Sequence, residues 1–80
     1  MRQAAEWGEE RTAARRAVED VPSAVRSDVA RVIETLLDGP DADVQSALDE
    51  LWRLLEPYPE LSERFFRLRV VDDAVEFLKT

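Results

Sequence analysis

The chain has no cysteine and no histidine, and it holds very little lysine or glycine. Without cysteine it forms no disulfide and offers no thiol nucleophile, and without histidine it has no imidazole base. Together these absences exclude the usual Cys/His zinc sites. Two glycines are too few for a loop that cradles phosphates. Because the chain lacks the side chains that most often carry out catalysis or hold a cofactor, we expect neither an enzyme nor a cofactor.

What the chain does hold is typical of a small globular protein. Of its 80 residues, 45% are hydrophobic and 36% are charged, which separates it from disordered chains. This length predicts a single helical domain over residues 1–80, with residues 1–8 fraying. No stretch approaches the roughly 20 apolar residues that span a bilayer. The start of the chain also lacks the apolar run of a signal peptide, so we expect a cytoplasmic protein without membrane contact.

Proline and glycine divide the chain into helical segments. Breaks fall at Val21-Pro22, at Gly39-Pro40 and at Pro57-Tyr58-Pro59. Between them, apolar residues recur at steps of three and four, which predicts helices over 22–38 and 42–56, with a weaker helix over 9–20. Either of two acids, Asp41 or Asp43, is placed to cap the helix over 42–56. The pattern predicts an all-α fold, a compact bundle of four to five short helices.

Beyond Pro59 the apolar residues form two stripes on roughly opposite sides of one helix. The stripes are Leu61, Phe65, Leu68, Val71, Val75 and Leu78 on one side and Phe66, Val70, Ala74 and Phe77 on the other. A helix unbroken to the end would bury Asp72, at a cost in free energy unless its carboxylate is paired. A break near Val71 removes the conflict and predicts helices over 60–70 and 73–79.

Two local patterns bear on that break. Asp73 and Glu76 have the spacing of a capping box, in which each side chain bonds a free backbone amide at a helix start. Phe66–Val70 also alternates like a strand, with arginines on the second face. A single strand would have no partner in this chain, so two helices are favoured.

The two central helix starts share a pattern. Residues 21–26 (VPSAVR) and 41–48 (DADVQSAL) each place a small turn before an apolar-polar-small step. They resemble the helix starts of HEAT-like repeats, and the resemblance implies antiparallel helical hairpins in the centre of the chain. About three repeats are needed to bury a continuous solenoid core. The resemblance therefore supports the hairpins and implies no function.

The negative charge is concentrated in one segment. The chain carries a net charge of −7, and residues 41–60 hold six acids against one base, a net −5. The acids predicted to form an acidic surface are Asp49, Glu50, Glu56 and Glu60. Such a surface either attracts a basic partner or is an ordinary solvated face that keeps a small protein in solution. The sequence favours the solvated face and leaves the basic partner open.

The arginines form two groups, Arg11/Arg15/Arg16 and Arg64/Arg67/Arg69, that could neutralise nucleic-acid phosphates. Acids lie at pairing distance from most of them on the same helix, which favours ion pairs within the chain over nucleic-acid binding. The predicted pairs are Arg2–Glu6, Arg15–Glu19, Arg16–Asp20, Glu60–Arg64, Glu63–Arg67 and Arg69–Asp73.

Two acid pairs are the remaining candidates for chemistry. Asp41 with Asp43 and Asp72 with Asp73 have spacings found at divalent-metal or acid–base sites. Hard cations need more oxygen ligands than either pair supplies, and helix capping explains both pairs more simply. We therefore expect no metal and no catalytic residue.

The apolar surplus points to a partner. A helix of a small bundle buries one apolar face, and the segment after Pro59 carries apolar residues on two opposite sides. Aromatic residues left exposed by such a surplus are typical binding anchors. The residues predicted to contact a partner are Trp52, Tyr58, Phe66, Val70 and Phe77, unless all of them are core. The predicted function is a non-catalytic protein–protein interaction module that forms a homodimer or docks on a larger protein.

Two other functions remain open. One is a small acidic inhibitor (an antitoxin, an immunity protein or a phage antagonist) that blocks a basic nucleic-acid-handling protein. The other is a weak nucleic-acid-binding regulator acting through Arg11, Arg15 and Arg16.

Overall fold

Five α-helices and one short 3-10 turn make up residues 8–79, the part of the chain that the computed structural model describes. They are α1 (Gly8–Glu19), α2 (Ser23–Asp38), the turn η2 (Asp41–Asp43), α3 (Val44–Leu55), α4 (Pro59–Phe66) and α5 (Arg69–Lys79). No strand occurs in this range, including at Phe66–Val70. The predicted all-α bundle is confirmed.

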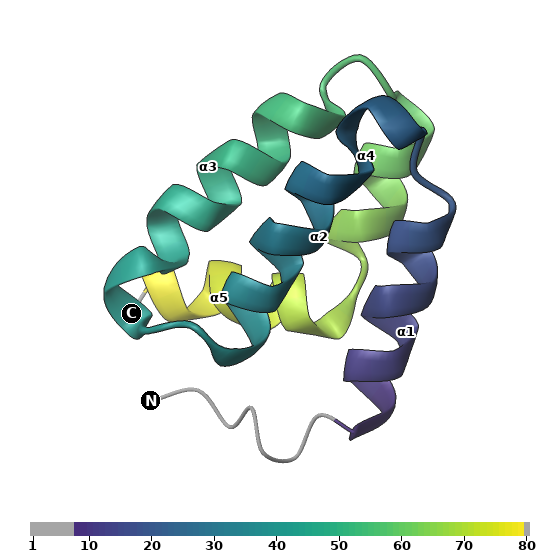
Figure 1. The fold of residues 1–80 in the computed structure, drawn as a ribbon. Helices are drawn as coiled ribbons and strands as arrows, with labels where there is room; N and C mark the ends of the chain where they lie inside the picture. The colour runs from purple at the N-terminus through teal and green to yellow at the C-terminus, as the bar shows by residue number, and fades with distance from the viewer. Residues whose placement is uncertain (1–7, 80) are drawn as a thin grey trace.

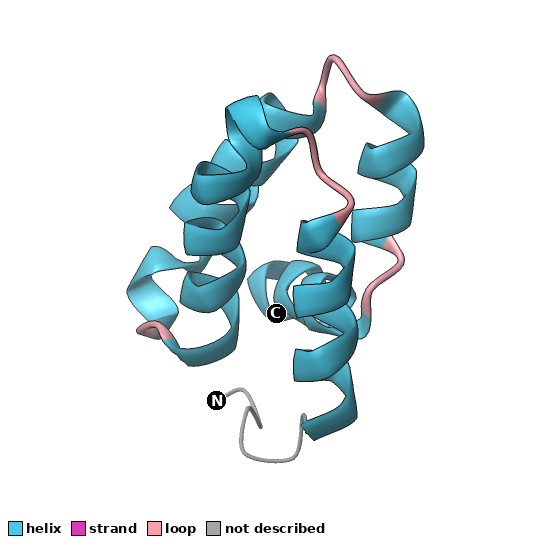
Figure 2. Ribbon diagram, turned by 45° about the vertical axis from the view of Figure 1, so that its right-hand side comes forward, coloured by secondary structure: helices cyan, strands magenta, loops and turns pink. Residues whose placement is uncertain are grey.

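The first four helices run alternately up and down, and α5 crosses their lower end (Figure 1). Short loops join consecutive helices (Figure 2). The helices α2 and α3 pack together as an antiparallel hairpin, as predicted. Because α4 returns beside α3 after a short turn, these two helices also face each other.

The core is built around the apolar faces of α2 and α3. Its fully buried side chains include Leu36 and Leu37 from α2, Leu51 and Leu55 from α3, and Phe65 from α4. No polar or charged residue is buried in the described range. Burial of each large side chain stabilises the fold by about 1.5–3 kcal/mol.

Gly39 ends α2 through a close approach of the backbone rather than an unusual torsion. Its φ is −76°, and its amide donates a hydrogen bond to the Thr35 carbonyl oxygen at 2.8 Å. A Cβ atom at this position would lie 2.5 Å from the same oxygen. Pro40 follows and leads into η2. Glycine is therefore required by the space beside Thr35.

The predicted cap of α3 is only partly right. Asp43 occupies the N-cap position, but its carboxylate makes no capping hydrogen bond. The backbone supplies bonds in its place, because the Val44 amide donates to the Asp41 carbonyl in the η2 turn. The negative charge of Asp43 still favours the helix start through the helix dipole.

The break between the last two helices falls at residues 67–68, not near Val71. The Leu68 amide donates to the Phe65 carbonyl at 3.0 Å, which closes a tight turn. Turning here places Phe65 of α4 and Val70 of α5 in the same core. Asp72 lies exposed in the first turn of α5. The predicted capping box at residues 73–76 is wrong, because both of its residues lie inside α5.

Arginine side chains mostly pair between helices rather than along one helix. Of the predicted pairs on one helix face, Glu63–Arg67 is present at 2.6 Å. Four others are replaced or missing, and Arg2–Glu6 lies outside the described residues. The pairs between helices are Arg11–Asp38 (2.6 Å), Arg15–Glu34 (2.9 Å), Arg31–Glu50, Arg64–Asp20 (2.5 Å) and Arg69–Glu10 (3.4 Å). Most of them connect α1 or its end to α2, α4 and α5.

Helix length and hydropathy also bear on membranes. Within residues 8–79, no helix combines the length and the apolar character needed to cross a bilayer.

Candidate partner-binding surface

The structure separates the five residues predicted to contact a partner. Val70 is 0% exposed and belongs to the core, so its place in the predicted interface is wrong. The turn at residues 67–68 is the physical reason, because it rotates Val70 inward. Trp52 is 59% exposed, whereas Tyr58, Phe66 and Phe77 are half-buried.

Trp52 and Phe66 are brought together from α3 and α4. Trp52 follows the fully buried Leu51, and one residue corresponds to about 100° around a helix, so its ring projects from the flank of the core face. The Trp52 and Phe66 ring centroids lie 5.5 Å apart with an interplanar angle of 77°. This is the edge-to-face geometry that aromatic pairs prefer.

The two rings form part of a shallow groove between α3 and α4, which we call the Trp52 groove. It has a volume of about 400 Å³. Trp52 and Glu56, one turn apart, contribute the α3 side. The complete lining is Trp52, Glu56, Pro59, Ser62, Glu63 and Phe66. Its lining is mostly apolar, and it carries two carboxylates, Glu56 at the C-terminal end of α3 and Glu63 on α4.

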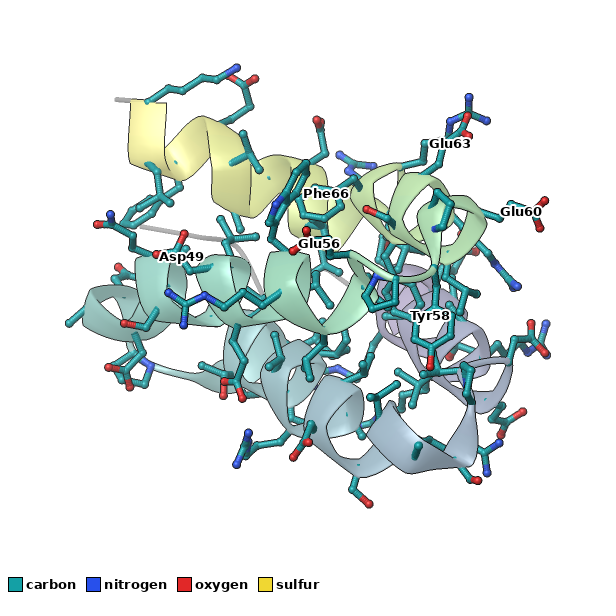
Figure 3. The ribbon with its side chains drawn as sticks, turned by 90° about the horizontal axis from the view of Figure 1, so that it is seen from above. Asp49, Glu56, Tyr58, Glu60, Glu63 and Phe66 are labelled. Atoms are coloured by element: carbon teal, nitrogen blue, oxygen red, sulfur yellow. The ribbon has the colours of Figure 1, made fainter. Side chains whose placement is uncertain are left out.

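Tyr58 and Phe77 lie outside the Trp52 groove. Tyr58 lines a separate hollow of about 400 Å³ with its neighbouring prolines, Glu60 and Leu61. Figure 3 shows Tyr58 on the side of the α3–α4 turn away from Phe66. Phe77 packs against the core from α5. The predicted partner-contacting residues therefore do not form one surface, and Trp52 with Phe66 is the pair that remains.

The four predicted acidic residues also separate. Glu50 pairs with Arg31 of α2. Asp49, Glu56 and Glu60 are exposed and make no ion pair within residues 8–79. Figure 3 shows Glu56 beside Phe66 and Glu60 at the outer side of α4. The acidic surface therefore overlaps the Trp52 groove at Glu56.

The sequence prediction missed three residues of the groove: Pro59, Ser62 and Glu63. Their signal is helical spacing, because positions 59, 62, 63 and 66 fall at i, i+3, i+4 and i+7 on one stripe of α4. The sequence pattern predicts Glu63 as the partner of Arg67, and that pair is present. Once α4 begins directly after the α3–α4 turn, this stripe faces Trp52.

The arginines predicted as phosphate ligands are largely occupied. Arg11 donates two hydrogen bonds to the Asp38 carboxylate, at 2.6 and 2.9 Å, and Arg15 donates two to Glu34. The hydrogen bonds from Arg11 lower the pKa of Asp38 below its usual value. Arg16 makes no ion pair within residues 8–79. This group offers little uncompensated positive charge to a nucleic acid.

Metal-ligating residues do not cluster in the described range. Within residues 8–79, no group of three or more Asp or Glu side chains could hold a metal ion. Asp41 and Asp43 lie exposed in η2, and Asp72 and Asp73 lie in the first turns of α5.

The chain matches no protein-family model, no curated protein and no solved structure. The resemblance of its centre to HEAT-like repeats has no support from a family match, although the antiparallel hairpin that it implied is present. The function is therefore argued from the surface itself.

Proposed function

We propose that the protein is a non-catalytic interaction module that docks on another protein through the Trp52 groove. The observation that carries the proposal is the exposure of Trp52, at 59%, beside the half-buried Phe66. Tryptophan is among the residues that contribute most to binding at interfaces. A partner that covers these rings would recover the free energy of about 25 cal/mol that each Å² of apolar surface costs in water.

The composition of the core supports this proposal, because Trp52 is not among the buried residues that form it. Leu48, Leu51 and Leu55 are the buried leucines of the inner face of α3, and Trp52 lies beside them at the surface. No buried side-chain nitrogen or oxygen in the described range is left without a hydrogen bond. Folding therefore uses only part of the Trp52 surface, and the larger, exposed part is left for a partner.

Charge favours a different protein over a second copy of this chain. In a two-fold symmetric dimer the same patch faces itself. Glu56 and Glu63 at the groove would then meet carboxylates of equal sign, which opposes association. A basic partner meets no such repulsion. The compartment proposed with this function remains the cytoplasm.

A second candidate function is suggested by the acids that have no partner in the described part of the fold. Glu56 lines the groove, Asp49 lies on α3 on one side of it and Glu60 lies at the outer side of α4. We propose as the alternative that these acids cover a basic site on a nucleic-acid-handling protein and inhibit it. The two proposals differ in the consequence of binding, since an inhibitor abolishes the activity of its target.

Affinity capture with matched variants tests the proposed function. Immobilised wild type, Trp52→Ala and Tyr58→Ala are compared on extract from the native source, and each retained protein is then purified and titrated against all three. We expect a partner that binds wild type and Tyr58→Ala but loses affinity for Trp52→Ala. Equal affinity for Trp52→Ala would show that the groove is not the docking surface. Sedimentation velocity across concentrations tests self-association, and a dimer dependent on Trp52 would replace the partner with a second copy.

A further inference from the structure

The Trp52 groove combines an aromatic floor with carboxylates on both sides. Glu56, directly after α3, and Glu63 of α4 line it together with the two rings. The face of a tryptophan ring attracts cations, because its π-electrons present negative charge above and below the plane. The negatively charged carboxylates at the same site also attract cations. This combination distinguishes the groove from a purely apolar one.

The indole remains accessible to such a cation. Trp52 contacts Phe66 edge-to-face, at 77°, so the two rings do not stack over each other. More than half of the Trp52 surface is exposed, at 59%. The exposed part of the ring is therefore available to a planar group of a partner.

The nearby carboxylates are available as partners. Asp49 and Glu56 lie three residues before and four residues after Trp52, and neither makes an ion pair within residues 8–79. Glu63 pairs with Arg67 at 2.6 Å, but its side chain is 63% exposed and that of Arg67 is 77% exposed. Such exposed pairs contribute little and exchange readily. Arg53, the single base of residues 41–60, does not line the groove.

We propose that the Trp52 groove binds an arginine side chain presented by an apolar-basic segment of the partner protein. The guanidinium lies against the Trp52 ring and pairs with Glu56, while the apolar residues beside it cover Phe66 and Pro59. Arginine fits better than lysine, because its planar group stacks on aromatic faces and bonds a carboxylate through two N–H groups. Nucleic-acid phosphates and anionic lipids do not fit, because the groove's own carboxylates repel them.

This inference rests on the proposed function and specifies the chemistry of its partner. It is tested with synthetic peptides, independently of the natural partner. A Trp7→Phe variant leaves Trp52 as the sole tryptophan, so fluorescence reports on the groove alone. The probe is a short amidated peptide with leucine and arginine on one helical face. Its matched control replaces each arginine with citrulline, which keeps the shape and removes the charge.

We expect the arginine peptide to change Trp52 fluorescence and to bind about tenfold more tightly than the citrulline peptide at low salt. Glu56→Gln should reduce this preference and its salt dependence, whereas Glu19→Gln, the same charge change on α1 outside the groove, should leave both unchanged. Far-UV circular dichroism confirms that each variant is folded.

The results that overturn the inference are distinct from those that overturn the function. Equal affinity for the two peptides, together with a natural partner that still requires Trp52, removes the arginine preference and keeps the docking groove. Tighter binding of a labelled oligonucleotide or of anionic vesicles than of the arginine peptide also overturns the inference. Peptide affinities unaffected by Trp52→Ala in the wild-type background overturn the arginine site itself, whatever the partner requires.

Discussion

Replacing two adjacent residues of α3 separates a residue used for folding from one left for binding. Leu51 is 0% exposed, and leucine-to-alanine changes in cores cost about 2–5 kcal/mol of unfolding free energy. Trp52 is 59% exposed, and its ring contact is the edge-to-face pair with Phe66. Such a pair contributes about 0.5–1.5 kcal/mol beyond the apolar area that it buries, and only the smaller part of the Trp52 surface is buried. Alanine also has a higher helix propensity than tryptophan, which offsets part of that loss.

We therefore expect Trp52→Ala to destabilise the protein less than Leu51→Ala, which should cost at least about 2 kcal/mol. Urea denaturation followed by far-UV circular dichroism measures both, because this signal does not depend on the tryptophan that is removed. A double-mutant cycle with Phe66→Ala isolates the ring pair and should give a coupling of about 0.5–1.5 kcal/mol. If Trp52→Ala destabilised the protein as much as Leu51→Ala, Trp52 would be part of the core and would not be a spare residue for binding.

Three further predictions test the fold. Gly39→Ala should lower stability by about 1–3 kcal/mol, because the new methyl group would lie 2.5 Å from a backbone oxygen. Gly8→Ala has nothing within 4 Å of its new methyl group and should be neutral or stabilising, so equal thermal midpoints for the two variants would contradict this prediction. The hydrogen bonds from Arg11 lower the pKa of Asp38 in the folded state. The Asp38 carboxylate therefore contributes stability that is complete above about pH 4 and is lost as the pH falls through the folded pKa, and Asp38→Asn should remove that part of the pH dependence of acid unfolding. Arg64→Gln should cost less than about 1 kcal/mol in urea melts, with the difference shrinking in high salt, because both side chains of its ion pair are at least half exposed.

The central helices could be predicted because their boundaries are set locally. Proline and glycine stop helices through torsion and steric limits that act within a few residues. Consequently the predicted helices over 22–38 and 42–56 agree with α2 and α3 to within about two residues at each end.

The C-terminal break was misplaced because its position is set by packing. Any turn between Phe66 and Asp72 would free Asp72 from burial, so the local pattern does not choose among them. The common core of Phe65 and Val70 makes that choice, and it lies between two helices rather than within one. The same misplacement led to the wrong interface prediction for Val70.

The ion pairs and the groove show the same limit. Sequence spacing identifies charges that are neighbours on one helix, and it does not show which helices lie side by side. Arg64 therefore was predicted to pair with Glu60 and pairs instead with Asp20. The stripe of α4 that carries Glu63 could be read from its spacing, but its position opposite Trp52 depends on how α3 and α4 pack.

Chemical-shift mapping tests the proposal that the Trp52 groove is the docking surface most directly. Isotope-labelled protein is titrated with the leucine–arginine peptide, and later with the purified partner. We expect the largest shifts at the Trp52 indole N–H and at the amides of Glu56 and residues 60–66. Shifts concentrated on α1 and α2, with the Trp52 indole unchanged, would contradict the proposal.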